Sequence, residues 1–337
     1  MVTVITGGAG FIGQHLVRQL VEQGARVRVV EKPGAKVDHL PSTVDVIEAD
    51  IVDRVAVRRA MRDANLVYHL AANPQLWTHQ RGQFHQVNYR GAVHVIEEAL
   101  AAGAVRVLHT STESILTRIN QSTPIAEDQE VPRDEVIGPY CQSKYRAECF
   151  ALRLGRTGAP VVIVNPTLPI GPGDWGRSPP TQMMLDCCLG KRQFYLEADL
   201  NLIDVRDVAA GMIATMECGT PGRRYLLAGE NWSIRRVFEF LATRTHQPLP
   251  TRRVPYGVAL ATAYLSEWIA DVFTHRMPAA SVTGVKLTRR RMHFDASRTW
   301  SELNITPRPV DATLHEVIEW FRHIGWVGAG KSTTTMR

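Results

Sequence analysis

The stretch VTVITGGAGFIG, residues 2–13, carries the clearest architectural signal in the chain, because it joins a β-rich run, a glycine loop and the start of a helical pattern. Its spaced glycines are Gly7, Gly10 and Gly13. Glycine permits a tight turn and a close backbone approach to a ligand, and the free N–H groups of a helix N-terminus point at bound phosphate. The spacing is G-x-x-G-x-x-G rather than G-x-G-x-x-G, and a plain tight turn is the alternative interpretation. In this context the stretch predicts the pyrophosphate site of a dinucleotide.

A dinucleotide site also needs a group that binds the adenosine ribose, usually at the end of the second strand. Glu31 stands there, 18 residues after Gly13. Its carboxylate can accept hydrogen bonds from both ribose hydroxyls but would repel a 2′-phosphate, so it favours NAD over NADP. Lys32 and Arg28 are close in the sequence and weaken this preference, and an ordinary surface glutamate is the alternative.

Short β-rich runs alternate with helical patterns through the first half of the chain. The predicted strands are 3–6, 27–31, 44–50, 66–71, 106–111 and 161–166, and the predicted helices are 12–23, 53–63, 86–102 and 140–154. This alternation predicts an α/β fold of the Rossmann type, a doubly wound parallel sheet with helices on both faces. We expect residues 1–166 to form the dinucleotide-binding domain, with returning segments near 200–230. Residues 167–326 should form mainly a smaller, interleaved α/β substrate-binding cap, and residues 327–337 a flexible tail.

The composition is that of an ordinary globular enzyme, with 45% hydrophobic and 21% charged residues in 337. No apolar run reaches the roughly eighteen residues of a membrane-spanning helix, and the N-terminus lacks the features of a secretory signal. The five cysteines are odd in number and form no C-x-x-C pair, which predicts a reduced, cytoplasmic protein. His69 has no partner at a metal-binding spacing, so we expect a packed strand residue and no metal site.

The formal net charge is +6, with basic clusters at 235–236, 252–253 and 289–291. Nucleic-acid binding would need such residues within a recognisable module, and the sequence contains none. We expect these clusters to be a solvated surface, with attraction to an anionic substrate or membrane surface as the alternative.

GWVGAGKS, residues 325–332, matches the triphosphate-binding pattern G-x-x-x-x-G-K-[ST] letter for letter. No predicted strand leads into it, and the five residues after Ser332 are too few for the helix that the site requires. We therefore expect part of a flexible tail rather than a nucleotide site.

PYCQSK, residues 139–144, places Tyr140 and Lys144 one helical turn apart, on the same helix face. Hydride transfer between a nicotinamide and a carbinol carbon requires a proton to move on or off the oxygen. A free tyrosine, whose pKa is about 10, is a poor base at neutral pH, and a lysine ammonium one turn away would lower that pKa. The spacing alone is a weak signal, with an ordinary helix as the alternative, but with the glycine loop it predicts a catalytic pair.

Further motifs follow the glycine loop in a fixed order: EAD (48–50), HLAA (69–72), NYRG (88–91), TST (110–112), YCQSK (140–144), NPTLPIGPGD (165–174) and NLIDVRDVAAG (201–211). In this order the chain resembles the extended short-chain dehydrogenases/reductases over roughly residues 1–326. It is most similar to the branch of dihydroflavonol reductases, 3β-hydroxysteroid dehydrogenases and hopanoid-associated sugar epimerases. The resemblance implies an NAD-dependent enzyme and, through two long pairing helices, a homodimer.

The resemblance also implies roles for single residues. The catalytic residues would be Thr112, Tyr140 and Lys144, with Lys144 also binding the nicotinamide ribose; Ser111, on the opposite side of the strand, is the alternative to Thr112. Asp50 and Ile51 should lie beside the adenine, Pro166 near the nicotinamide, and Asn88 in a structural or cofactor-side position. The full set of expected cofactor-binding residues is Gly7, Gly10, Phe11, Ile12, Gly13, Glu31, Asp50, Ile51, Leu70, Ala71, Ala72, Tyr140, Lys144 and Pro166.

Two positions bear on the substrate. Where the sugar-nucleotide enzymes of this family commonly have an asparagine and an arginine that bind a diphosphate, this chain has Leu168 and Leu200. A buried diphosphate needs hydrogen-bond donors, so the leucines argue against a sugar nucleotide, although Arg177 or Arg206 could substitute.

VALATAYLSEWIADVF, residues 258–273, has apolar residues at 258, 261, 265, 268, 269 and 272. We expect this stripe to pack into the core; it could instead wall a pocket for an apolar substrate or rest on a membrane surface.

Three functional hypotheses remain. The first is an NAD-dependent oxidoreductase that acts on the hydroxyl or ketone carbon of an apolar or lipid-like small molecule. The second is a sugar or nucleotide-sugar epimerase or dehydratase that uses NAD transiently. The third is a dinucleotide-binding protein without catalysis, which the intact pair of Tyr140 and Lys144 argues against.

Overall fold

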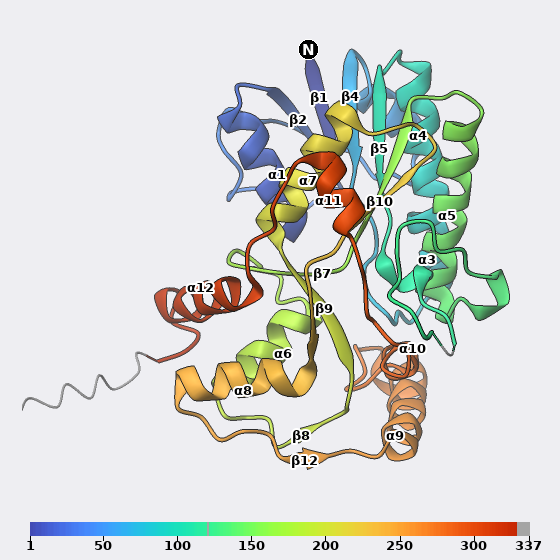
Figure 1. The fold of residues 1–337 in the computed structure, drawn as a ribbon. Helices are drawn as coiled ribbons and strands as arrows, with labels where there is room; N and C mark the ends of the chain where they lie inside the picture. Colours follow the sequence, from blue (N-terminus) through green and yellow to red (C-terminus); the bar gives the residue numbers. More distant parts are fainter. Residues whose placement is uncertain (120, 329–337) are drawn as a thin grey trace, which may run out of the picture.

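A computed structural model describes residues 1–119 and 121–328. Its centre is a seven-stranded parallel sheet (Figure 1). The strands are β1 (Val2–Thr6), β2 (Arg26–Glu31), β3 (Asp45–Glu48), β4 (Ala64–His69), β5 (Arg106–Thr110), β6 (Val161–Pro166) and β10 (Arg224–Leu227). They lie in the order β10-β6-β5-β4-β1-β2-β3, so the chain reverses direction across the sheet between β1 and β4. The carboxyl ends of β1 and β4 therefore border the crevice in which doubly wound sheets bind ligands.

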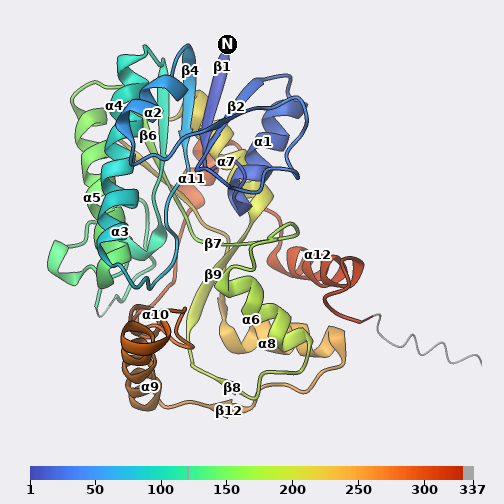
Figure 2. The same cartoon turned by 180° about the vertical axis from the view of Figure 1, so that it is seen from behind.

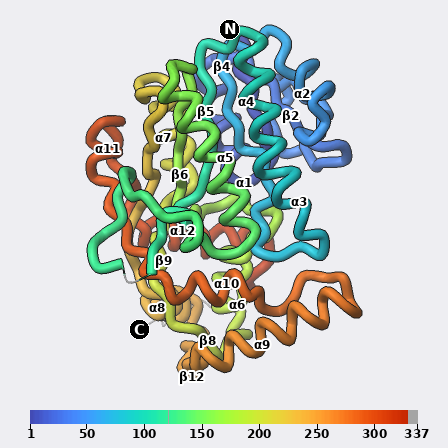
Figure 3. The backbone as a smooth tube through the Cα atoms, turned by 90° about the vertical axis from the view of Figure 1, so that its right-hand side faces the viewer, coloured from blue at the N-terminus to red at the C-terminus, as the bar shows by residue number. Residues whose placement is uncertain are grey.

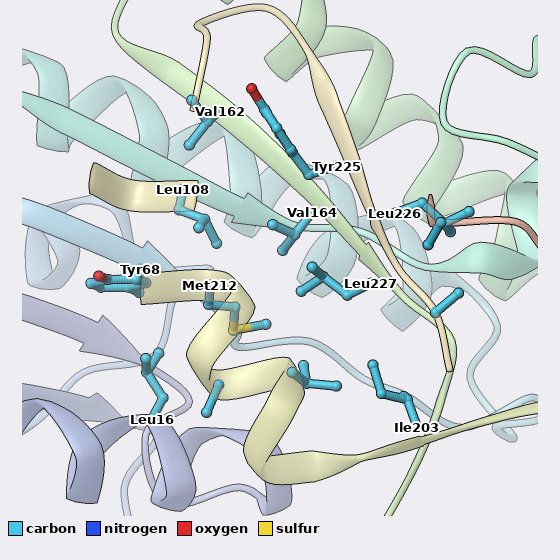
Figure 4. Close-up of a cluster of buried hydrophobic side chains, with 14 of the residues drawn as sticks. Leu16, Tyr68, Leu108, Val162, Val164, Ile203, Met212, Tyr225, Leu226 and Leu227 are labelled. Carbon is cyan, nitrogen blue, oxygen red and sulfur yellow. The ribbon is translucent and has the colours of Figure 1, made fainter. Parts of the chain in front are cut away.

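Helices cover both faces of this sheet (Figures 1 and 2). The helices of this part are α1 (Phe11–Glu22), α2 (Arg54–Ala60), α4 (Ala92–Ala101), α5 (Gly138–Arg156), α7 (Val205–Cys218) and α11 (Ser297–Leu303). On one face α1 and α7 pack side by side, and Figure 4 shows Leu16 and Met212 from these helices against Leu108 of the sheet. On the other face α2, α4 and α5 bury apolar side chains such as Val57, Val95 and Ala151. Burial on both faces explains why the strands read as continuous apolar runs.

The six strands predicted from the sequence are confirmed, as is the doubly wound parallel sheet. The seventh strand, β10, comes from the returning part of the chain and pairs with β6. The helix predicted over 86–102 is a π-helix, η1 (His85–Gly91), followed by α4. Short elements on the same side are α3 (Gly82–Phe84), η2 (Glu113–Leu116) and η3 (Arg133–Glu135).

A smaller part of the chain lies below the carboxyl ends of the sheet (Figure 1). It contains a three-stranded sheet in the order β11-β9-β7 and a two-stranded sheet of β12 and β8. Its strands are β7 (Leu168–Ile170), β8 (Phe194–Tyr195), β9 (Asp199–Asp204), β11 (Glu230–Ser233) and β12 (Arg252–Arg253), and its helices α6 (Pro179–Cys188), α8 (Ile234–Thr245) and α12 (Val310–His323). These elements share one hydrophobic core.

The remaining helices are α9 (Tyr256–Ile269), η4 (Ala270–Thr274) and α10 (Val282–Leu287). The prediction that the apolar stripe of 258–273 packs into the core is wrong, because its positions 258, 261, 265, 268, 269 and 272 are all exposed. In α9 itself the small residue Ala263 is the one that is buried. None of the helices among the described residues has the length and apolar character needed to cross a bilayer.

The pattern match at 325–332 begins directly after α12, where a triphosphate loop would need a preceding strand. Residues 329–337, which include most of the predicted tail, lie outside the described residues.

Candidate active site

The glycine loop turns directly from β1 into α1, and its glycines are required by close packing. Gly7 has a φ of 76°, and a Cβ there would lie 2.7 Å from the amide nitrogen of Ala71. A Cβ at Gly13 would collide with the carbonyl oxygen of Gly7. Gly10 is the N-cap of α1 and no side chain caps this helix, so the first amides, from Phe11 onward, remain available to an anion. This cradle fits the pyrophosphate of a dinucleotide.

Glu31 ends β2 beside the loop. Its Oε1 accepts a hydrogen bond of 2.7 Å from the backbone N–H of Ala9, and burial raises the pKa of its carboxyl. The second oxygen can face a ribose. Arg28, which could have received a 2′-phosphate, instead bonds Asp45 and the backbone carbonyls of Ala60 and Arg62.

The other residues expected near the dinucleotide gather at the same edge of the sheet. Leu70 donates its N–H to the carbonyl of Thr6, which brings the segment 70–72 against the glycine loop. Ala49, just before Asp50, donates its N–H to the carbonyl of Glu31. Ile51 is buried against Gly91 of η1, and Pro166 ends β6.

Asn88 lies in η1 and has a structural position. Its Nδ2 donates to Ser143 Oγ of α5 at 3.1 Å and to the carbonyl of Asn73, and its Oδ1 accepts from the N–H of Asn73. Ser143 Oγ in turn donates to the carbonyl of Tyr140. Asn88 thus ties the loop after β4 to the helix that carries Tyr140.

Tyr140 and Lys144 lie one turn apart at the start of α5, as predicted. The Lys144 ammonium is buried and donates a hydrogen bond of 2.6 Å to the carbonyl of Thr110 at the end of β5. Burial lowers its pKa to about 8, and the carboxylate of Glu148, one turn further along α5, acts in the opposite direction. Lys144 is thereby fixed to the sheet beside Tyr140.

Of the two candidate hydroxyls, that of Thr112 is the one that acts on the pKa of Tyr140, which it lowers. Thr112 Oγ1 donates to Glu113 Oε2 at 2.8 Å and lies 3.2 Å from Ser114 Oγ, whereas the Ser111 hydroxyl is buried with no partner among the described residues. Extended backbone at Thr112 explains the difference, because consecutive side chains point to opposite sides.

Glu113 is a site residue that sequence reasoning missed. Its carboxylate is buried and accepts hydrogen bonds from Thr112 Oγ1 at 2.8 Å and Ser114 Oγ at 3.1 Å. Burial raises the pKa of this carboxyl. The sequence feature that could have pointed to Glu113 is its charge, because it lies between Thr112 and the apolar residues Ile115 and Leu116.

The pKa of Tyr140 is shifted in the direction opposite to the one the sequence argument expects. It lies above its ordinary value, chiefly because the phenol is buried, and Cys141 and Glu113 raise it further, while the Thr112 hydroxyl lowers it. The ammonium of Lys144 is engaged by the carbonyl of Thr110, and burial of the phenol is the largest cause of the upward shift. Tyr140 therefore carries its proton at neutral pH.

A buried polar network below Lys144 was also missed. Glu148 is 2% exposed and receives Nε and Nη2 of Arg224 at 2.9 and 2.7 Å, while its other oxygen accepts from Asn165 Nδ2 at 2.6 Å. Asn165 also donates to the carbonyl of Thr112. The network links the helix of Tyr140 to β6 and β10.

His69, expected to be a packed strand residue, is buried and stacks on His109 with 5.5 Å between ring centroids. Burial lowers the pKa of His69 to about 3, so the ring is neutral beside Lys144. Thr6 Oγ1 lies 2.7 Å from its Nδ1. No cluster of metal-ligating side chains occurs within residues 1–119 and 121–328.

A cavity of about 200 Å³ opens next to Tyr140. It lies between the loop that precedes α3, the start of α5, and helices α9 and α10. Its apolar walls include Leu76, Phe84 and Ile137, and the ring of Phe84 meets that of Tyr140 edge-on with 6.2 Å between centroids. The polar groups on the wall include the ion pair of Arg81 and Glu267.

Leu168 and Leu200 are half-buried in the cap, where both pack against its hydrophobic core. The two arginines that could replace diphosphate ligands are already engaged. Arg206 pairs with Asp204 and Glu316, and Arg177 stacks on the ring of Trp326 at 4.0 Å.

Residues 3–228 match the family model described as the NAD dependent epimerase/dehydratase family. A protein from Synechocystis sp. named "Putative dihydroflavonol 4-reductase" is 33% identical over 328 residues, 96% of this chain and 95% of its own length. "Sterol demethylase protein B" from Methylococcus capsulatus is 29% identical over 329 residues, 97% of this chain and all of its own length. The crystal structure of gox2253 superposes with a TM-score of 0.85 at 31% identity, covering 97% of this chain and 99% of that one.

Proposed function

The chain belongs to the NAD-dependent epimerase/dehydratase family of short-chain dehydrogenases/reductases, and we propose that it transfers hydride at a hydroxyl or ketone carbon of an apolar or lipid-like small molecule, with Tyr140 as general acid/base. The observation that carries this proposal is the position of Tyr140 at the start of α5, where its ring meets that of Phe84 in the wall of an apolar cavity. Lys144 stands one turn away.

The chemistry assigns a task to each side chain. The nicotinamide, when bound, supplies or accepts the hydride. Thr112 holds the substrate oxygen, and Tyr140 gives a proton to it or takes one from it. Because the pKa of Tyr140 is raised, the phenol is protonated at neutral pH, the form that donates to the oxygen of a ketone under reduction.

NAD would be held along the crevice between β1 and β4. The amides of the glycine loop at Phe11 and Ile12 would bind the pyrophosphate, Glu31 the adenosine ribose, and Lys144 the nicotinamide ribose. NAD is favoured over NADP because Glu31 would repel a 2′-phosphate and Arg28 is bonded elsewhere. We assign this binding to residues 1–166 with β10, and substrate binding mainly to 167–326.

An apolar substrate is supported by the cavity wall and by the two leucines of the cap. Leu76, Phe84 and Ile137 present hydrocarbon and aromatic surface, and a ligand that buries such surface gains about 25 cal/mol per Å². The relative from Methylococcus capsulatus carries the word sterol in its name, which agrees with this substrate class.

The alternative is an epimerase or dehydratase acting on a sugar or sugar nucleotide, which the family description also covers. It has less support, because Leu168 and Leu200 occupy the expected diphosphate positions and Arg177 and Arg206 are engaged. We retain it as the second candidate.

One experiment separates the two candidates. The purified chain is mixed with NADH and, in turn, with steroid ketones and aryl ketones, and in a separate assay with NAD in its oxidised form and UDP-glucose. The absorbance of the reduced nicotinamide is followed, and chromatography detects any sugar product. We expect stoichiometric NADH consumption with an apolar ketone and a much lower kcat/KM with NADPH. Conversion of UDP-glucose without net NADH change would establish the alternative, and binding of NAD with no turnover of any substrate would leave the third hypothesis.

Two further proposals concern the oligomeric state and the cellular setting. The resemblance supports a homodimer, which light scattering would test. The five cysteines are free thiols, which supports a reducing, cytoplasmic setting.

A further inference from the structure

The α9 face is an exposed apolar surface formed by Leu265, Trp268, Ile269, Val272, Phe273 and Met277. Trp268 is 55% exposed and Phe273 66%, and the two rings lie edge to face with 5.5 Å between centroids. Figures 1 and 3 show α9 at the end of the molecule opposite the N-terminus. A helix this apolar is normally buried, so its exposure indicates that another molecule covers this face.

Cations lie close to this face in the sequence and in the fold. Arg276 follows η4 and is exposed, and Arg289 and Lys286 of the α10 segment lie over the rings of Tyr256 and Tyr264 of α9. Residues 252–291 contain seven Arg or Lys (252, 253, 276, 286, 289, 290 and 291) and two Asp or Glu (267 and 271). Both acids pair with Arg81, and Arg253 and the buried Arg290 pair with Glu197 and Glu135. The exposed arginines at 252, 276, 289 and 291 leave an excess of positive charge around the face.

We propose that the α9 face docks on the surface of an anionic lipid bilayer, with its apolar side chains in the interfacial layer and the cations against lipid headgroups. A flat apolar helix with aromatic residues and a basic border has the composition of an interfacial anchor. A second copy of the chain fits less well, because a two-fold interface would bring the same positive border against itself.

The docking has a consequence for the cavity beside Tyr140. Tyr264 and Glu267 of α9 line that cavity, and Lys286 of α10 does so too. A bilayer held by the α9 face would therefore lie next to the substrate cavity, where an apolar molecule could pass from lipid to protein. The docking itself is independent of the proposed reaction, since vesicle binding is measured without NAD or substrate.

The test is co-sedimentation of the full chain with vesicles of phosphatidylcholine alone or with phosphatidylglycerol. We expect binding to the anionic vesicles that weakens with salt, and a partition coefficient at least about tenfold lower for Trp268→Ser/Phe273→Ser. Arg276→Gln/Arg289→Gln should weaken binding to anionic vesicles. The matched control is Val55→Ser/Val105→Ser, which removes two equally exposed valines from the nucleotide-binding part and should bind as the wild type does.

Three outcomes would overturn the proposal: a wild-type chain that stays in the supernatant, equal sedimentation of the Trp268→Ser/Phe273→Ser variant, or light scattering that shows this variant converting a dimer to a monomer. The last would identify the face as an interface between copies. Quenching of wild-type tryptophan fluorescence by brominated lipids provides a readout that needs no variant; absence of quenching with anionic vesicles would also refute docking.

Discussion

Replacing Arg224 by methionine tests whether the buried network under Lys144 stabilises the fold. Arg224 gives one hydrogen bond and a second ion-pair contact to Glu148, and two hydrogen bonds to the backbone carbonyls of Glu127 and Gln129. In Arg224→Met the Glu148 carboxylate stays buried with the amide of Asn165 as its remaining partner. Breaking a buried ion pair by removing one side costs about 3–5 kcal/mol of unfolding free energy.

The cost converts to a measurable melting temperature. The entropy of unfolding is about 2.1 cal/mol/K per residue, or about 0.7 kcal/mol/K for 337 residues unfolding in one transition. We therefore expect calorimetry to show a melting temperature about 4–7 °C lower for Arg224→Met. The control is Arg235→Met, which removes one partner of the exposed pair with Glu239 and should leave the melting temperature unchanged within error.

A double variant isolates the buried charge. Arg224→Met/Glu148→Gln also removes the carboxylate, so it should lose about 1–2 kcal/mol less than the sum of the two single changes. Additive losses, or an Arg224→Met variant as stable as the surface control, would refute the argument that an uncompensated buried carboxylate sets the cost.

Tyr140→Phe should lower kcat by about 10²–10⁴-fold while calorimetry finds NAD affinity unchanged; an active variant would remove Tyr140 from the mechanism. Gly13→Ala should weaken NAD binding severely because its Cβ would meet the Gly7 carbonyl, whereas Gly82→Ala, with open space around it, should bind NAD normally; equal affinities would contradict the cradle. Burial lowers the pKa of Lys144 from 10.5 to about 8, so between these values the unfolded chain alone binds that proton and stability rises with pH. The melting temperature of the wild type minus that of Lys144→Met should therefore increase through this window, and a constant difference would show that Lys144 titrates normally.

The sequence predicts the central sheet well because its signals are local. Most of the strands from β1 to β6 are apolar runs, since burial on both faces selects such runs, and helical segments follow β1, β3, β4 and β5. The β10 strand has only four residues, and the chain reaches its place in the sheet after returning from the cap. Its pairing with β6 therefore cannot be predicted from the sequence of β10 itself. The α9 stripe shows the same limit, since periodicity identifies an apolar face and neighbouring elements decide whether that face is covered.

Some features of the candidate site could likewise be predicted from the sequence and others could not. Motif order predicts the roles of Tyr140, Lys144 and Thr112. The structure has Tyr140 and Lys144 one turn apart on α5 and Lys144 bonded to the end of β5, and the catalytic roles stay predictions. The pairing of Glu148 with Arg224 joins residues 76 positions apart and has no sequence signature. The raised pKa of Tyr140 was missed for a related reason: a neighbouring lysine is visible in the sequence, but the burial that raises the pKa of the phenol is not.

The pairing of β10 with β6 also affects how the protein is made. Until residue 227 has left the ribosome, β6, whose residues are all buried in the finished fold, is an open edge of an incomplete sheet. Two thirds of the chain must therefore be synthesised before that edge is closed, and nascent chains that stall earlier present a strand able to pair with other molecules. A gene fragment that ends after β6 would produce a protein prone to aggregation rather than a free-standing nucleotide-binding unit.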